Sequence, residues 1–207
     1  MSNLVSDIIS PKPLKLKIGL YFGSYNPIHI GHMVIANYII EFTNLDQLWF
    51  VVSPQNPHKE KDNLLEDYHR LELVNRAIGD DNRFRVSNIE FSLQKPSYTI
   101  NTLTHLQEKF PNHSFVIIMG SDNLGSFHKW KNYEMILANY GIIVYPRPGF
   151  DRDKLIVHPN VTVAEDAPLM EISSSFIRDS IKKGKDVRHF MPQKVWEYLD
   201  EMNFYRK

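Results

Sequence analysis

The sequence predicts an α/β fold: a doubly wound parallel sheet with a small helical extension at the C-terminal end. Two observations predict it. Short apolar runs of strand length alternate with amphipathic segments of helix length, which is the pattern of successive βαβ units. Polar stretches rich in Gly or Pro follow four of these runs, so they would gather at the carboxyl edge of one sheet, where such sheets bind ligands.

The elements follow in order along the chain. Strands are expected at 16–22, 48–53, 84–87, 115–119 and 141–145. Helices are expected at 32–42, 67–78, 99–110 and 133–139, where apolar residues recur at helical spacing. A closing helix is expected to start at Pro192. We expect residues 1–13 to form a disordered or extended lead and residues 14–207 to form a single domain.

Composition excludes several classes of function. Hydrophobic residues make up 43% and charged residues 23% of the 207 residues, which is the balance of a soluble globular protein. Lys and Arg number 24 against 24 Asp and Glu, so there is no net positive charge to hold nucleic acid. No apolar run approaches the roughly 20 residues that span a membrane. The absence of cysteine excludes thiolate chemistry and is compatible with a cytoplasmic location, which we expect.

The stretch FGSYNPIHIGH, residues 22–32, follows the first predicted strand. Gly23 permits close approach of a ligand, and Pro27 fixes the turn before the next helix. A structural turn explains both, but not His29 and His32, which would share one face of the first helical turn. The alternative is one packed and one surface histidine. Placed after a strand and an Asn-Pro turn, the pair favours a site that holds an anion.

A second candidate segment is ISSSFIR, residues 172–178. Ser173, Ser174 or Ser175 can cap a helix and offer hydroxyl and backbone N–H donors, and Arg178 lies one turn further on. A routine helix cap with a solvated arginine is the alternative. Together with the histidine turn, this segment favours binding of a polyphosphate.

These residues resemble a known family. GSYNPIHIGH resembles the G-[TS]-[FY]-[DN]-P-x-H-x-G-H signature of the nucleotidyltransferase superfamily, and ISSSFIR resembles its I-S-S-[ST]-x-I-R motif. SPQNPHK, PSYTINTL and MGSDNLGSFHKW followed by RPGF are similar to stretches of bacterial nicotinate-nucleotide adenylyltransferases, over nearly all of the chain after Leu16. The resemblance implies a Rossmann-like nucleotidyltransferase fold. Lys131 departs from the pattern, because relatives often carry an aromatic residue there.

The resemblance also implies a reaction: transfer of AMP from ATP to nicotinate mononucleotide, giving nicotinate adenine dinucleotide and pyrophosphate in NAD biosynthesis. Because the acceptor phosphate is already ionised near neutral pH, alignment and charge neutralisation suffice and no general base is needed. The implied catalytic residues are His29, His32, Lys59 and Arg178. Mg²⁺ is expected to bind with ATP, and no residue is named as a metal ligand.

The substrate contacts come from the same resemblance. Those implied for ATP are Gly23, Ser24, Tyr25, Asn26, His29, Gly31, His32, Asp122, Ser174, Ser175 and Arg178. Those implied for nicotinate mononucleotide are Lys59, Tyr98, Thr99, Trp130 and Lys131. Two alternatives stay open: an adenylyltransferase for nicotinamide mononucleotide or another phosphorylated acceptor, and a non-catalytic nucleotide sensor. The sequence also leaves homo-oligomer formation, regulation, the divalent ion and the role of Lys131 open.

Overall fold

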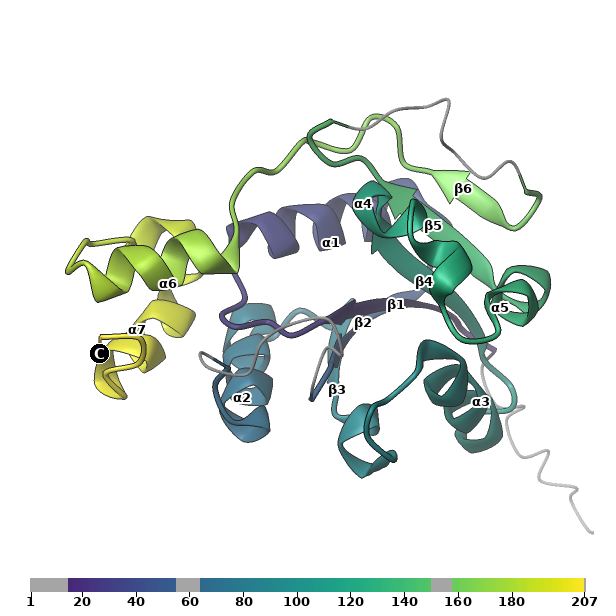
Figure 1. The fold of residues 1–207 in the computed structure, drawn as a ribbon, viewed down its shortest axis with the longest axis horizontal. Coiled ribbons are helices and arrows are strands. Elements are labelled where there is room, and N and C mark those ends of the chain that lie inside the picture. The colour runs from purple at the N-terminus through teal and green to yellow at the C-terminus, as the bar shows by residue number, and fades with distance from the viewer. Residues whose placement is uncertain (1–14, 55–63, 150–157, 207) are drawn as a thin grey trace, which may run out of the picture.

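The computed structural model of the protein describes residues 15–54, 64–149 and 158–206 and has the predicted α/β architecture (Figure 1). One parallel sheet forms its centre, and helices cover both faces. The lead expected at residues 1–13 lies outside the described residues.

The described strands belong to a single six-stranded sheet, in the order β3-β2-β1-β4-β5-β6, and each neighbouring pair is parallel. Their bounds are β1 Lys17–Gly23, β2 Gln47–Val52, β3 Phe84–Ser87, β4 Ser114–Gly120, β5 Gly141–Tyr145 and β6 Val161–Val163. The five predicted strands are confirmed, with ends at or next to the expected residues. Only β6 was missed, because a three-residue strand is too short to show an apolar pattern.

The predicted helices are also present, and two of them match at both ends. The α-helices are α1 Ile30–Phe42, α2 Asp67–Ile78, α3 Thr99–Lys109, α4 Ser121–Leu124, α5 Tyr133–Asn139, α6 Ser174–Lys182 and α7 Gln193–Glu201. Short 3₁₀ helices are η1 Ile89–Ser92, η2 Phe127–Lys129 and η4 Arg188–Phe190. Pro192 is the N-cap of α7 rather than its first residue. Among the described helices none has the length and apolar character needed to cross a bilayer.

Two apolar cores pack against the two faces of the sheet. Alternate residues of a strand point to opposite faces, so Leu20 of β1 packs with Leu103 of α3, while Tyr21 packs with Ile39 of α1. The α2, α6 and α7 helices join α1 in its core, and α5 joins α3. Burial of each of these aliphatic side chains stabilises the fold by about 1.5–3 kcal/mol. The sheet is therefore a rigid support for the loops at its edge.

The strand order reverses direction beside β1, which lies between β2 and β4. In doubly wound sheets the crevice at such a switch point, outside the carboxyl ends of the strands, is where ligands bind. The two C-terminal helices α6 and α7 lie beside α1 and α2, away from α3 and α5 (Figure 1). The predicted helical extension is therefore confirmed, and it flanks one side of the crevice.

Candidate active site

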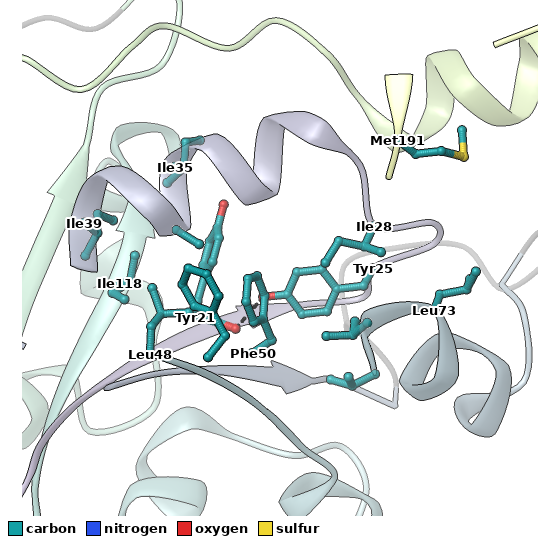
Figure 2. Packing of buried hydrophobic residues seen from close by; sticks show 14 of the residues in the cluster. Tyr21, Tyr25, Ile28, Ile35, Ile39, Leu48, Phe50, Leu73, Ile118 and Met191 are labelled. Carbon is teal, nitrogen blue, oxygen red and sulfur yellow. Dashed lines mark hydrogen bonds between the residues drawn. The ribbon is translucent and has the colours of Figure 1, made fainter. Parts of the chain in front are cut away.

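The turn that joins β1 to α1 is built on the buried side chain of Tyr25. Its backbone is left-handed (φ +47°), which is uncommon for a bulky residue, and the side chain is 1% exposed. The Tyr25 hydroxyl donates a 2.5 Å hydrogen bond to the Tyr21 carbonyl (Figure 2). A Cβ atom at Gly23 would lie 2.7 Å from the Tyr25 ring, so this position requires glycine. Because the Tyr25 side chain packs into the core, only the backbone of this residue could contact ATP.

His29 and His32 lie ring against ring at the start of α1. His29 is the N-cap residue, and the two ring centroids are 3.8 Å apart with their planes inclined by 32°. The His29 N–H donates to Nδ1 of His32 at 3.3 Å, so Nε2 carries the proton of a neutral His32 ring. A Cβ atom on Gly31 would lie 3.0 Å from Nδ1 of His29. Glycine therefore leaves room for the His29 ring.

The His29 side chain is almost fully buried, and one of its ring nitrogens has no hydrogen bond within the part of the chain that the structure describes. It is 4% exposed, and burial together with the nearby Arg147 guanidinium lowers its pKa from 6.5 to about 4. His29 is therefore neutral near pH 7. Its Nδ1 atom has no hydrogen-bond partner among the described residues. Buried polar atoms are nearly always paired, so this nitrogen is suited to bond a ligand that enters the crevice.

The start of α6 docks onto the same turn. Arg178 donates from Nη1 to the Asn26 carbonyl at 2.8 Å and from Nη2 to Oγ of Ser175 at 3.2 Å. The Ser174 hydroxyl donates to the Pro27 carbonyl at 2.8 Å. Two motifs that are about 150 residues apart in the chain thus meet, as the sequence predicted. The result is a cluster of imidazole, hydroxyl and guanidinium donors that suits a polyphosphate.

Ser173 performs the capping that the sequence assigned to one of three serines. Its hydroxyl accepts a 3.2 Å hydrogen bond from the Phe176 N–H, and its backbone is extended, as expected for an N-cap residue. Ser173 is thereby separated in role from Ser174 and Ser175, whose hydroxyls engage the turn and Arg178.

The other wall of the crevice follows β4 and β5. Asp122 lies in α4, with its side chain 59% exposed, and Oδ1 is 3.8 Å from Nε of Arg147. The Arg147 N–H also donates to the Ser121 hydroxyl at 3.0 Å, which ties the ends of the two strands together. A Cβ atom at Gly120 would lie 2.3 Å from the Asp122 carboxylate, so a larger residue there would displace this exposed side chain from its present position. Sequence reasoning missed Arg147, although its place in YPRPGF after a strand was the available signal.

Four of the five residues predicted to bind the acceptor lie on the α3 side of the sheet. The Lys131 ammonium lies 4.7 Å from the centre of the Tyr98 ring, and Tyr98 is the N-cap of α3, next to Thr99. Trp130 packs on Phe127 with ring centroids 5.3 Å apart. The structure thus brings Tyr98, Thr99, Trp130 and Lys131 to the strand-end side of this face, on the opposite face from α1 and α6. Lys59 lies outside the described residues.

Arg70 is a buried guanidinium that the sequence gave no signal to find, since it lies in a helix with an otherwise ordinary polar face. It is 0% exposed and donates at 2.7 Å to the carbonyls of both Ser24 and Ser53, and at 2.9 Å to that of Leu65. Asp67 pairs with it at 2.5 Å. Arg70 therefore ties the turn after β1 to the chain after β2. A buried charge that is fully hydrogen-bonded holds its neighbours in one arrangement.

A groove also lies at the opposite, amino-terminal edge of the sheet. Lys17, Asn44, Gln107 and Asn160 contribute polar atoms to it. Its described lining includes two lysines and His113, whose Nδ1 atom accepts from the Leu16 N–H, but neither a guanidinium nor a carboxylate, whereas the carboxyl edge brings His29, His32 and Arg178 together. We therefore place the chemistry at the carboxyl edge.

The fold and this donor cluster at the switch point define a nucleotidyltransferase. Residues 20–180 match the model of the cytidylyltransferase-like family. A relative from Flavobacterium johnsoniae, named "Probable nicotinate-nucleotide adenylyltransferase", is 55% identical over 194 residues, which cover 93% of this chain and 100% of the relative. A relative of the same name from Bacteroides fragilis is 50% identical over 185 residues, covering 89% and 92%. The chain belongs to the family of nicotinate-nucleotide adenylyltransferases.

Solved structures match the same fold. The Plasmodium falciparum nicotinic acid mononucleotide adenylyltransferase complexed with NaAD has a TM-score of 0.79 at 22% identity, covering 92% of this chain and 98% of that one. A Vibrio parahaemolyticus protein described as a putative nicotinate-nucleotide adenylyltransferase has a TM-score of 0.69 at 22% identity, covering 94% and 97%. At these identities the likeness bears on the fold, and the predicted Rossmann-like nucleotidyltransferase fold is confirmed.

Proposed function

We propose that this protein transfers AMP from ATP to nicotinate mononucleotide and releases pyrophosphate. The observation that carries the proposal is the buried Nδ1 atom of His29, which has no hydrogen-bond partner in the described chain and lies beside His32 in the turn that Arg178 also contacts. These donors meet at the switch point of a sheet in a chain of this family.

The reaction requires alignment more than proton transfer. An oxygen of the acceptor 5′-phosphate attacks the α-phosphorus of ATP, a new P–O bond forms, and the bond to the β-phosphate oxygen breaks. Since the attacking oxygen is already ionised, no side chain has to remove a proton. The protein must hold two anions in line and offset the charge that grows on the leaving pyrophosphate. Hydrogen-bond donors in a partly dry site supply that charge stabilisation.

The phosphate-binding side would work as follows. A neutral His29 and His32 donate to phosphate oxygens, with His32 acting on the transition state, and Arg178 adds a fixed positive charge. Backbone groups of the turn surround the triphosphate; the residues involved are Gly23, Ser24, Tyr25, Asn26 and Gly31. Ser174 and Ser175 contribute hydrogen-bond donors from the start of α6. Lys59, which is not among the described residues, is proposed to bind the phosphates as well.

The two ends of the dinucleotide product would bind at separate groups. Asp122 accepts a hydrogen bond from a ribose hydroxyl of the adenosine half. The nicotinate ring packs on Trp130 near Tyr98 and Thr99, and Lys131 adds positive charge near the nicotinate carboxylate. This last role predicts that the Lys131→Ala variant loses part of its preference for the acid over the amide acceptor, measured as the ratio of kcat/KM values. An unchanged ratio would remove Lys131 from specificity.

ATP would enter as its Mg²⁺ complex. Among the described residues there is no cluster of three or more histidine or acidic side chains placed to hold a metal ion. Mg²⁺ typically keeps several waters and takes phosphate oxygens as its other ligands. It can therefore bind with ATP at a site whose side chains are mainly hydrogen-bond donors. Chelation of Mg²⁺ is expected to abolish turnover, and its restoration to recover it.

Pyrophosphate release from ATP tests the proposal, with nicotinate mononucleotide and nicotinamide mononucleotide compared side by side. A higher kcat/KM for the nicotinate acceptor is expected. Faster reaction with the amide would indicate the other adenylyltransferase activity. Tight ATP binding without pyrophosphate release for either acceptor would indicate a nucleotide sensor. We also place the reaction in the cytoplasm, in keeping with a chain that has no cysteine.

A further inference from the structure

The chain reverses direction after α7 and returns toward the phosphate-binding turn. Asn203 has a left-handed backbone (φ +54°), its N–H donates to the Asp200 carbonyl at 3.1 Å, and the Phe204 N–H donates to the Leu199 carbonyl at 3.0 Å. These two bonds form a Schellman motif, which ends a helix and redirects the chain. The Phe204 ring then packs 4.8 Å from the His69 ring of α2. The last turn of the described chain is thus fixed in place.

Tyr205, the next residue, reaches the turn itself. Its hydroxyl donates a 2.6 Å hydrogen bond to Oδ1 of Asn26, across 179 positions of sequence. Its backbone is also left-handed (φ +63°), a conformation that costs energy for a tyrosine. Strained residues of this kind persist where surrounding contacts hold them, and here the hydroxyl bond is such a contact.

Asn26 is the junction of three segments. Its carbonyl accepts from Arg178 of α6, and its Oδ1 atom accepts from the Tyr205 hydroxyl and, at 3.1 Å, from the Leu65 N–H. The side chain of Asn26 is therefore anchored from the chain before α2 and from the C-terminal tail. Asn26 lies three residues before His29, so its placement sets where the histidine pair and Arg178 stand relative to each other.

The Tyr205 hydroxyl also remains a donor over the working pH range. Burial raises the pKa of Tyr205 well above its usual value, although the guanidiniums of Arg178 and Arg70 oppose that shift. A neutral phenol keeps its proton and so keeps the bond to Asn26.

We propose that Tyr205 is a positioning residue of the active site, which holds Asn26 so that Arg178 and the histidine pair meet the triphosphate in the reactive geometry. The inference rests on the proposed function of this site. The role proposed for Tyr205 involves no contact with the reacting atoms. It acts through Asn26, and its loss would misplace donors whose contribution depends on alignment.

The test compares Tyr205→Phe with Tyr198→Phe. The first change removes the hydroxyl and keeps the ring. The second removes a hydroxyl of the same C-terminal segment, which is bonded at 2.9 Å to Nδ1 of His69 and not to the turn. We expect Tyr205→Phe to lower kcat about tenfold, the value of one aligned hydrogen bond, with KM for ATP within about twofold of wild type. Tyr198→Phe should keep the wild-type kcat.

Thermal unfolding of both variants separates positioning from general stability. If Tyr205→Phe and Tyr198→Phe have the same midpoint, a drop in kcat confined to Tyr205→Phe supports the proposal. A wild-type kcat in Tyr205→Phe would overturn it, and so would equal losses of kcat in the two variants. Absence of pyrophosphate release in the wild-type protein is a different result, because it would refute the proposed function before the variants are compared.

Discussion

At the scale of single residues, the two histidines of the turn have different surroundings, which suit the different roles that we propose for them. His29 is buried, neutral and without a described partner at Nδ1, so the tautomer that carries its proton on Nδ1 can donate one hydrogen bond to a phosphate oxygen. His32 is held by the His29 N–H and by a near-perpendicular contact with the Tyr25 ring, whose centroid lies 5.2 Å from that of the His32 ring. A ring fixed on two sides donates along one direction, which is what stabilisation of a transition state requires.

The His32→Ala variant is expected to lower kcat by about two to three orders of magnitude, the usual loss when a preorganised donor to developing charge is removed. Pyrophosphate release at saturating ATP and acceptor measures it. His189→Ala, at an exposed position of η4, is the control and should retain wild-type kcat. A normal kcat in a folded His32→Ala protein would exclude His32 from the chemistry.

Protonation of His29 should couple stability to pH. Its pKa is about 4 in the folded chain and 6.5 when unperturbed, so the unfolded state binds the proton more tightly. The stabilisation is complete above the unfolded pKa and is lost as pH falls, by about 2 kcal/mol between about pH 7.5 and about pH 5. Urea unfolding of wild type and His29→Gln at both pH values measures it. The variant should lose less stability on acidification, and an equal loss in both proteins would contradict the account.

At the scale of elements, the sequence predicted the helices and strands in which apolar residues recur at regular spacing. The ends of α2, α5, β3 and β5 agree with expectation, because each is bounded by residues that interrupt the period. The short α4 and β6 were missed, since four and three residues are fewer than one clear repeat. Their positions are set by tertiary contacts, such as the hydrogen bond from the Ala164 N–H to the Val144 carbonyl.

The helix α6 gives a test at this scale, because its N-cap serine can be compared with a serine inside the helix. Ser173→Ala removes the hydroxyl that caps α6 and should lower the free energy of unfolding by about 1 kcal/mol. Ser180→Ala lies within the same helix and serves as the control, with a change close to zero. Urea unfolding near pH 7 measures both. Equal stability of the two variants would mean that the cap contributes nothing.

The candidate site was only partly visible in the sequence for a related reason. His29, His32 and Arg178 lie in local patterns that chemistry can interpret. Arg70 and Tyr205 act through bonds to residues that are tens of positions or more away along the chain, and no local spacing encodes such a pairing. The sequence therefore predicts donors at the site better than it predicts the residues that hold them.

At the scale of the whole molecule, the sheet separates the site into two flanks. The donors that we propose for the phosphates belong to the turn before α1 and to α6, on one face, and Trp130 and Lys131 follow η2 on the other face. The ends of β1 and β4, which pair side by side, lie between the flanks. The net charge is zero, so local donors rather than a general field must hold the anions. A ligand that spans the β1 and β4 ends can engage both flanks at once.

This division predicts how ligands stabilise the protein. At equal concentration, nicotinate adenine dinucleotide should raise the midpoint of thermal unfolding more than AMP or nicotinate mononucleotide does. The dinucleotide contacts both flanks, but it loses the translational freedom of only one molecule on binding. Lys131→Ala, on the acceptor flank, should reduce the shift caused by the dinucleotide and leave the shift caused by AMP unchanged. If AMP alone produces the full shift of the dinucleotide, then the α3 side of the sheet does not bind the nicotinate half, and the acceptor must lie elsewhere on the carboxyl edge.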